Sequence, residues 1–273
     1  MRLAALSDPE PARCESLAPG VPRHESAAEM LAAGGVDALI LATPAATHLV
    51  DARLAAGAGL PALVEKPPAA NAAEAAELAT LEPAPWVGFN RRFEPGLGRL
   101  RSRIPSDGSL ELSLELHHPA GSWGSYVVAD DVLAASGSHL IDLARWLSRS
   151  EIERVRSSEV EPTLARVELV LERGRASISC RSGAPHRDRV EVRQAGRSVS
   201  RYTADGPFRR LSTRLGRPTL TGLVALLIRE LEEFARASRG EPAPNLATAA
   251  DGLAVMTAID AVRVAGSASR EPQ

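Results

Sequence analysis

Residues 36–44 read Val-Asp-Ala-Leu-Ile-Leu-Ala-Thr-Pro and contain the clearest strand signal in the 273-residue chain. From Val36 to Ala42 the run is short, continuous and mostly apolar, as in a parallel strand that is buried on both faces. Pro44 suits the first turn of a helix, and we expect that helix to continue to about Gly57. The stretch therefore predicts one strand and one helix of a parallel α/β sheet.

The same alternation of strand and helix continues on both sides of this stretch. We expect strands at residues 2–7, 62–64 and 86–90 and a brief one at 21–25. Ser26 and Asn71 are each followed three residues later by Glu, a capping pattern that opens a helix. Strands that alternate with helices of about ten residues indicate βαβ units. Residues 1–89 therefore predict a Rossmann-like, doubly wound parallel sheet.

A different pattern begins at residue 90. Residues 110–118 alternate between apolar and polar side chains, as in an antiparallel strand with one solvated face. Further strands are expected at 152–160, 163–173, 175–182 and 188–194, and helices at 131–147, 220–238 and 247–266. Residues 90–273 therefore predict an α+β domain on a mainly antiparallel open sheet.

Composition excludes several classes of function. The net charge of -2 and the pI near 6.3 provide no general attraction to nucleic acid or to an anionic membrane. Cys14 and Cys180 are too few and too far apart for a disulfide framework or a zinc site, and they suit a reducing compartment. No run of about 18 apolar residues is present. We expect a cytoplasmic protein with a small-molecule partner and no bound metal.

Residues 61–68, Pro-Ala-Leu-Val-Glu-Lys-Pro-Pro, place a carboxylate and an amine where a short strand must end. The chain has 32 basic side chains, and Lys66 is the only lysine among them. Lys can lose its proton when it is partly buried, whereas Arg stays charged, so proton transfer favours Lys. Lys66 is therefore a candidate catalytic residue. The alternative is a lysine that persists by chance in an Arg-biased composition.

Four motifs in this order resemble the Gfo/Idh/MocA family of nicotinamide-dependent oxidoreductases, which act mostly on sugars and cyclic polyols. The first is the 36–44 stretch with His48, and the second is Glu65-Lys66-Pro67. The third is Val87-Gly-Phe-Asn-Arg-Arg-Phe-Glu-Pro95, and the fourth is Gly137-Ser-His-Leu-Ile-Asp-Leu-Ala-Arg-Trp-Leu147. Together the motifs span nearly the whole chain. The resemblance implies that residues 90–273 serve substrate binding and homo-oligomerisation through their sheet.

The resemblance also implies a set of cofactor contacts. Asp8 matches the acid that binds the adenosine ribose, which favours NAD over NADP because a carboxylate repels a 2′-phosphate. Thr43, Pro44 and His48 match the loop that lines the nicotinamide side of the cofactor cleft. Glu65 belongs to the same cofactor site and would orient the backbone or Lys66. Asp8 as a helix N-cap and His48 as a plain helix-face histidine stay open as alternatives.

Substrate contacts follow from the same resemblance. Lys66 matches the lysine beside the nicotinamide and the substrate hydroxyl, with a cis Lys66-Pro67 bond. His139 matches the family's candidate general acid/base, with Asp142 as its structural partner on the helix. Arg92 and Trp123 would border the substrate pocket. A structural helix histidine at 139 and a surface arginine at 92 are the alternatives.

Two departures from the family pattern affect the expected activity. Ala135 stands where many members have an aspartate, four residues before the histidine. The sequence also contains no G-x-G-x-x-G, the turn that holds the pyrophosphate in a unit of roughly 30 residues. In the strand order 3-2-1-4-5-6 that unit supplies the central strand. The strands at 2–7 and 36–42 must therefore pair with each other or leave exposed edges.

Three explanations for the absent glycine motif are open: a start codon assigned too late, a decayed gene, or a shortened protein with a non-catalytic role. We expect weak binding of nicotinamide cofactor to the chain as written. The main hypothesis is hydride transfer between NAD and a sugar or cyclic polyol, with Lys66 and His139 handling the hydroxyl proton. The alternative is a catalytically inactive paralogue that binds a ligand or a partner subunit.

Overall fold

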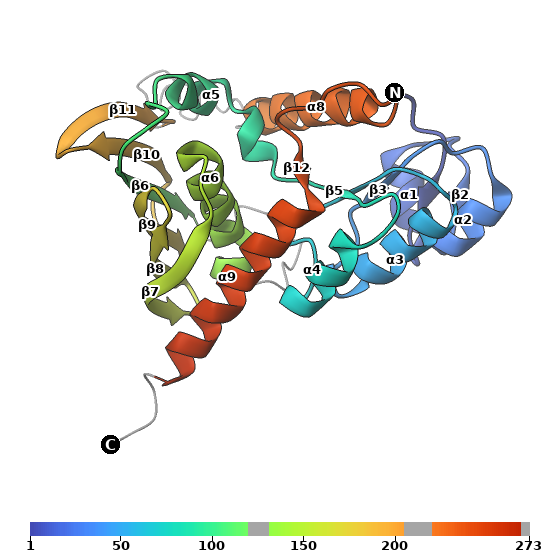
Figure 1. The fold of residues 1–273 in the computed structure, drawn as a ribbon. Helices are drawn as coiled ribbons and strands as arrows, with labels where there is room; N and C mark the ends of the chain where they lie inside the picture. The colour runs from blue at the N-terminus through green and yellow to red at the C-terminus, as the bar shows by residue number, and fades with distance from the viewer. Residues whose placement is uncertain (120–130, 205–219, 269–273) are drawn as a thin grey trace. The chain divides into compact units, whose positions relative to one another are not determined.

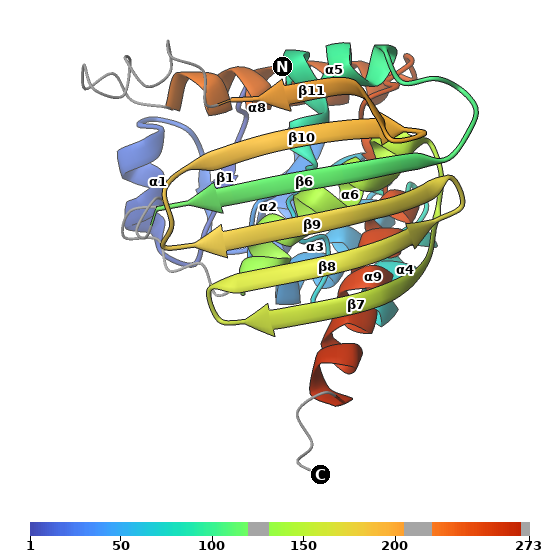
Figure 2. The same ribbon diagram turned by 90° about the vertical axis from the view of Figure 1, so that its left-hand side faces the viewer.

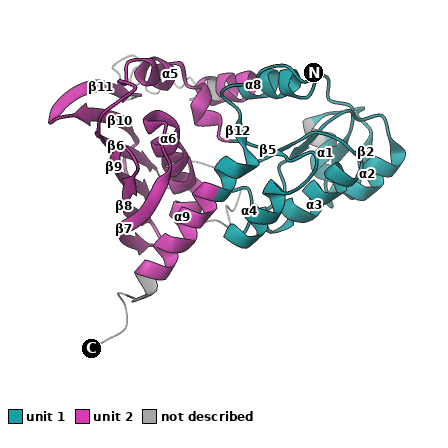
Figure 3. Cartoon of the chain, in the orientation of Figure 1, with its two compact units in different colours: residues 1–88, 230–253 teal, residues 89–229, 254–273 magenta. Residues whose placement is uncertain are grey.

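The computed structural model describes residues 1–119, 131–204 and 220–268, and the chain divides into two compact units (Figures 1 and 3). Unit 1 comprises residues 1–88 and 230–253, and unit 2 comprises residues 89–229 and 254–273.

A four-stranded sheet in the order β12-β5-β4-β3 forms the centre of unit 1. Strands β3 (Leu39–Leu41), β4 (Ala62–Val64) and β5 (Trp86–Val87) are parallel, and β12 (Ala247–Thr248) pairs antiparallel with β5. All three residues of β4 are buried. The apolar runs at 36–42 and 62–64 therefore both contribute parallel strands, but β3 is shorter than the first run, and its exposed Ile40 contradicts the expected burial on both faces.

Four helices of unit 1 begin where the sequence indicates. They are α1 (Pro11–Leu17), α2 (Ala27–Ala33), α3 (Ala45–Gly57) and α4 (Ala72–Ala79). The Ser26 hydroxyl accepts from the Glu29 backbone N–H at 3.2 Å, and the Asn71 side chain accepts from the Glu74 backbone N–H at 2.9 Å. Pro44 occupies the N-cap position of α3. Local capping thus fixes the start of α2 and α4.

The strand expected at 2–7 is short and lies outside the four-stranded sheet. Strand β1 (Leu6–Ser7) pairs in parallel with β2 (Arg23–His24) as a separate two-stranded sheet. Strand β3 pairs with β4 and, in the described part of the chain, not with β1. The strands at 2–7 and 36–42 were expected either to pair with each other or to leave exposed edges. The structure shows an exposed edge at β3, where Ile40 is 46% exposed.

Residues 230–253 pack with the parallel sheet, whereas the sequence pattern had placed them with the second domain. The ring of Phe234, on α8 (Leu220–Ala237), meets Trp86 of β5 edge-on with ring centroids 5.8 Å apart. Strand β12 extends the same sheet through Thr248 and Trp86. A strand of two residues is too short to show an alternating pattern of side chains. The sequence therefore does not indicate that the chain comes back to the sheet of unit 1 at β12.

A six-stranded sheet in the order β11-β10-β6-β9-β8-β7 forms unit 2 (Figure 2). Its strands are β6 (Leu110–His118), β7 (Ile152–Glu161), β8 (Leu164–Leu171), β9 (Gly174–Ser182), β10 (Arg187–Gln194) and β11 (Arg197–Thr203). All neighbours are antiparallel except β6 and β9, which are parallel. The sheet is mainly antiparallel as predicted, and β11 is a strand that the sequence analysis missed.

Helices cover one face of this sheet. Ala176, Ile178 and Cys180 of β9 are buried, whereas the alternate residues Arg175 and Ser177 lie on the other face. That other face is turned toward the viewer in Figure 2, and no described helix crosses in front of it.

The remaining helices are α5 (Pro95–Ser102), α6 (Ser138–Ser148) and α9 (Ala249–Ala268), with 3₁₀ and π turns at Asn90–Phe93 and Leu133–Gly137.

Replacing Phe234 by Ala tests how α8 is anchored to unit 1. The side chain is fully buried. We expect the free energy of unfolding to fall by about 3–5 kcal/mol, because the substitution leaves a cavity against Trp86. Urea unfolding followed by circular dichroism measures this. Ile228→Ala on the same helix is the control, since Ile228 is 50% exposed and should change stability by only about 0.5 kcal/mol. Equal effects of the two variants would contradict the packing described.

Candidate active site

Two neighbouring strands of unit 1 end at the same edge of the sheet. In the parallel register Leu41 of β3 lies beside Val64 of β4. Thr43 and Pro44 follow the first strand, and Glu65 and Lys66 follow the second. Open α/β sheets bind ligands outside the carboxyl ends of their strands. The structure therefore brings together the loop and the lysine that the sequence analysis selected.

His48 joins the two loops. It is buried on α3, with 1% of its surface exposed. Its Nε2 lies 2.7 Å from the Thr43 carbonyl oxygen, and its Nδ1 lies 3.1 Å from the Pro67 carbonyl oxygen. Burial lowers the pKa of His48, and the two backbone carbonyls oppose that shift. Both ring nitrogens thus face backbone carbonyls, one at the β3 end and one at the β4 end, and the single N–H of the neutral ring donates to one of them.

Thr43 and Pro44 have further roles in the same loop. The Thr43 hydroxyl donates to Asp51 at 2.9 Å, and the Pro44 carbonyl accepts from the Thr47 backbone N–H at 2.8 Å. These bonds hold the β3–α3 loop against the first two turns of α3. Asp51 has no motif signal in the sequence, and the sequence analysis missed it.

Glu65 and Lys66 lie at the end of β4. The Glu65 backbone N–H donates to the Leu41 carbonyl, which extends the β3–β4 ladder. The Glu65 carboxylate accepts from the Lys66 backbone N–H at 3.2 Å. Burial raises the pKa of Glu65, while Lys66 lowers it. The Lys66-Pro67 bond is cis, as the motif implies, and Lys66 is half-buried.

Asp8 follows β1 and is partly exposed. Its Oδ1 accepts from the Glu10 backbone N–H at 2.7 Å, and 28% of its side chain is exposed. The N-cap position of α1 belongs to Glu10, which makes no side-chain capping bond. Asp8 therefore closes a local turn ahead of α1 instead of capping the helix directly.

His139 is the second residue of α6 in unit 2. It is 8% exposed, and its ring meets Phe89 edge-on with centroids 6.2 Å apart. The π turn at Leu133–Gly137 directly precedes this helix and contains Ala135. Such turns are frequent at functional sites because they redirect the side chains that follow. The sequence pattern predicts a regular helix from 131, and regular α geometry begins at Ser138.

Arg92 is buried and paired. Its Nε donates to Asp142 Oδ2 at 2.9 Å, and its Nη2 donates to Oδ1 at 2.5 Å. Arg92 is 6% exposed and Asp142 is fully buried, so Arg92 is not the surface arginine of the alternative interpretation. The neighbouring Arg91 pairs with Asp188 of β10 at 2.6 Å. The two arginines connect the Asn90–Phe93 turn to α6 and to the sheet of unit 2.

The remaining expectations concern Trp123, a metal site, membrane spans and the two cysteines. Trp123 lies outside the described residues. Across residues 1–119, 131–204 and 220–268, no cluster of three or more His, Cys, Asp or Glu side chains could hold a metal ion. The described helices include none long and apolar enough to cross a membrane. Both cysteines are buried and free, and burial raises the pKa of Cys180 to about 12.

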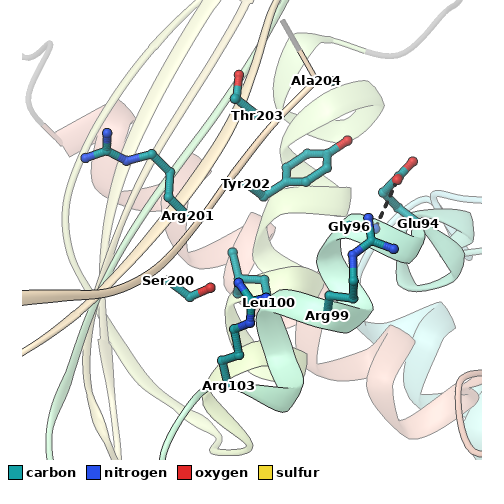
Figure 4. Close-up of a pocket in the computed structure, with 10 residues that line it drawn as sticks. All are labelled: Glu94, Gly96, Arg99, Leu100, Arg103, Ser200, Arg201, Tyr202, Thr203 and Ala204. Atoms are coloured by element: carbon teal, nitrogen blue, oxygen red, sulfur yellow. Dashed lines mark hydrogen bonds between the residues drawn. The ribbon is translucent and has the colours of Figure 1, made fainter. Parts of the chain in front are cut away.

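A pocket of about 470 Å³ opens between α5 and β11 in unit 2 (Figure 4). Arg99, Arg103 and Arg201 are exposed at its rim, and Arg201 pairs with Glu191 at 3.0 Å. Ser200, Tyr202 and Glu94 also line it. None of the candidate catalytic or cofactor-binding residues lies in this pocket.

Comparison with known proteins identifies the family. Residues 1–84 match the sequence pattern of the Gfo/Idh/MocA group, described as an oxidoreductase family with an NAD-binding Rossmann fold. The rhizopine catabolism protein MocA of Rhizobium meliloti is 30% identical over 291 aligned positions, which cover 96% of this chain and 86% of that protein. The chain belongs to the Gfo/Idh/MocA family of NAD-binding oxidoreductases.

Two further comparisons are more limited. Inositol 2-dehydrogenase 2 of Saccharopolyspora erythraea is 30% identical over 55% of this chain, and the chain spans about half, 47%, of that enzyme. The crystal structure of scyllo-inositol dehydrogenase from Lactobacillus casei with NAD(H) and scyllo-inositol superimposes with a TM-score of 0.78. It covers 98% of this chain and 90% of that chain at 18% identity, so it shows a shared fold.

The residues at the strand ends fit part of an NAD molecule. Asp8 offers a partly exposed carboxylate, a group that can accept hydrogen bonds from hydroxyls, and Thr43, Pro44 and Lys66 lie where β3 and β4 end. The 273 residues contain no G-x-G-x-x-G, so the pyrophosphate contacts of that motif have no counterpart in the sequence.

Replacing Asp142 by Ala tests whether its pair with Arg92 is structural. We expect the free energy of unfolding to fall by about 3–5 kcal/mol, because the substitution leaves a buried guanidinium without its carboxylate. Glu159→Ala is the matched control. Glu159 pairs with Arg166 at the surface, with side chains 49% and 58% exposed, and such pairs contribute about 0–1 kcal/mol. Urea unfolding compares the two variants. A loss for Asp142→Ala no larger than for Glu159→Ala would contradict a structural role.

Proposed function

We propose that the chain oxidises a ring hydroxyl of a cyclic polyol of the inositol class, or of a related sugar, with NAD as hydride acceptor. The observation that carries this proposal is the full-length match to MocA, because it covers both units of the chain. The inositol 2-dehydrogenase and the scyllo-inositol dehydrogenase support the choice of a cyclic polyol. The same relatives disfavour a non-catalytic binding subunit.

Lys66 and His139 are the residues that we assign to the hydroxyl proton. NAD, when bound, supplies the C4 position that accepts hydride from the carbinol carbon. Lys66, half-buried after β4, would bind the substrate hydroxyl and take its proton as the carbonyl forms. His139 would act as the second acid/base group from the start of α6. Neither role requires a metal ion.

The remaining candidates hold the reactants. Asp8 would bind the adenosine ribose, and Thr43 and Pro44 would line the nicotinamide side. His48 would hold that loop against Pro67, with Glu65 positioned by the Lys66 backbone. Arg92 would contribute to the substrate pocket from its buried pair with Asp142, and Trp123 would line the same pocket.

Lys66→Met tests the proposed base. We expect kcat for polyol oxidation to fall by roughly 10²–10⁴-fold, because a positioned acid/base group contributes about that much. Absorbance of reduced nicotinamide, with a panel of inositols and sugars, measures the rate. Lys66→Arg is the matched variant, since it keeps the charge but cannot release the proton, and it should be nearly as slow.

A titration of each protein with NADH is the control for cofactor binding. The titration separates a loss of cofactor affinity from a loss of chemistry, because Lys66 would also lie beside the nicotinamide, and it tests the expected weak binding of the chain. A Lys66→Met enzyme that keeps kcat within about tenfold of wild type would exclude Lys66 as the base.

We also propose a homo-oligomer that forms through the sheet of unit 2. The support is the sheet face without a described helix, on which the alternate residues of β9 lie.

Ser177→Arg, at the middle of β9, should lower the oligomer mass, because a long charged side chain would separate the packed faces. Light scattering coupled to size exclusion measures the mass. Ser102→Arg on α5 is the control, and an unchanged mass for Ser177→Arg would refute the proposed interface.

A further inference from the structure

The pocket between α5 and β11 lies within unit 2, and the proposed oxidation does not use it. Pockets that hold small molecules have volumes of about 300–1,000 Å³. This pocket, at about 470 Å³, falls in that range. Figure 4 shows its described lining, with side chains from α5 facing side chains from the end of β11. The two elements therefore determine which ligand the pocket can bind.

Arg99 and Arg103 supply positive charge from the α5 side. They are four residues apart, so their side chains leave the same face of the helix. Both are exposed, and neither forms an ion pair with a carboxylate of the described residues. Arg201 differs, because it points away from the other lining residues in Figure 4 and pairs with Glu191 at 3.0 Å. Two guanidinium groups of α5 can thus bind an anion.

Ser200 supplies a buried hydroxyl from the β11 side. The residue is 8% exposed, and its Oγ has no hydrogen-bond partner in the described part of the chain. A buried hydroxyl without a partner costs free energy, which an acceptor on a ligand would offset. Because side chains alternate along a strand, Ser200 lies on the same face of β11 as Tyr202, and both line the pocket. Rotation about the χ1 bond of serine lets the hydroxyl turn toward a ligand.

The remaining lining residues set the shape of the pocket. A Cβ atom on Gly96 would lie 2.6 Å from two ring carbons of Tyr202, so the glycine lets this ring pack against α5. The ring provides an apolar wall beside the polar groups. Glu94 is the one carboxylate among the described lining residues, and it accepts from the Gly96 backbone N–H at 3.2 Å. Its negative charge is therefore held at the start of α5, whereas Arg103 follows the end of that helix.

We propose that this pocket binds a phosphorylated small molecule, with the phosphate held by Arg99 and Arg103 and with the Ser200 hydroxyl as a further donor. The planar fork of an arginine matches the oxygens of a phosphate, and charge-assisted hydrogen bonds of this kind are strong. A phosphate has more acceptor oxygens than a carboxylate, which suits three donor groups from two elements. The organic part of the ligand lies against the Tyr202 ring. This binding does not depend on hydride transfer.

Calorimetric titration of the full chain with inorganic phosphate and with glucose 6-phosphate tests the site. We expect both to bind saturably and glucose 6-phosphate to bind more tightly, because its sugar contacts Tyr202. Glucose, which has no phosphate, should not bind the pocket. A folded chain that binds neither phosphate compound would overturn the proposal.

Substitution of the two arginines locates the bound phosphate. Arg99→Gln and Arg103→Gln should each weaken glucose 6-phosphate binding by about tenfold or more, because each loses hydrogen bonds to a charged group. Arg197→Gln is the matched control, since Arg197 is exposed on β11 and is not among the residues that line the pocket. Its Kd should stay within about threefold of wild type, because salt screens a distant surface charge. Equal weakening by all three variants would indicate general surface charge and would overturn the site.

Ser200→Ala tests the buried donor. The substitution should weaken phosphate binding by about 2- to 10-fold, as expected for one hydrogen bond. The melting temperature of the ligand-free protein should not fall, because the hydroxyl has no hydrogen bond to lose among the described residues. A lower melting temperature together with unchanged affinity would show that the hydroxyl serves the fold and would contradict its role as a donor.

Citrate separates phosphate from carboxylate as the recognised group. At the same ionic strength it should bind more weakly than glucose 6-phosphate, and equal or tighter binding would overturn the assignment to phosphate. The proposed oxidation is tested separately, because calorimetry needs no turnover. Phosphate binding that depends on Arg99 and Arg103 in a chain without polyol oxidation would reject the proposed function and support this site.

Discussion

The parallel pairing of β3 with β4 is the constraint on which the site of unit 1 depends. Because Leu41 and Val64 are in register, both strands end at one edge, and their loops leave the sheet side by side. His48 then lies between the two loops, with its ring nitrogens facing the carbonyls of Thr43 and Pro67. All three residues of β4 are buried, and Leu39 and Leu41 of β3 are buried beside them. The position of Lys66 thus follows from the pairing of two three-residue strands.

Much of this arrangement could be predicted from the sequence. The strands at 62–64 and 110–118 have the predicted bounds, because a continuous apolar run and a strict alternation are the two patterns that sequence shows most clearly. The cis Lys66-Pro67 bond and the family were expected from the motifs. The roles of the site residues stay predictions, because they depend on ligands and not on the fold alone.

Other features have no signal in the sequence. Strand β12 and the packing of Phe234 on Trp86 join segments that lie about 150 residues apart in the sequence. Local sequence patterns do not indicate which sheet a helix near the C-terminus packs against. Arg92 looks like any other arginine of an Arg-rich chain, yet its buried pair with Asp142 holds the start of unit 2 to α6. Glu230 likewise reads as one of several glutamates on an amphipathic helix. Only its burial, with an Oε1 that has no hydrogen-bond partner, distinguishes it.

The central claim is that this chain moves a hydride from a polyol ring carbon to NAD. The most direct measurement is deuterium transfer: the purified protein is incubated with NAD and an inositol deuterated at its ring carbons, and the nicotinamide product is analysed by mass spectrometry. The account predicts a reduced cofactor that carries one deuterium. A reduced cofactor without deuterium, or no reduced cofactor from a folded protein that binds NADH, would contradict it.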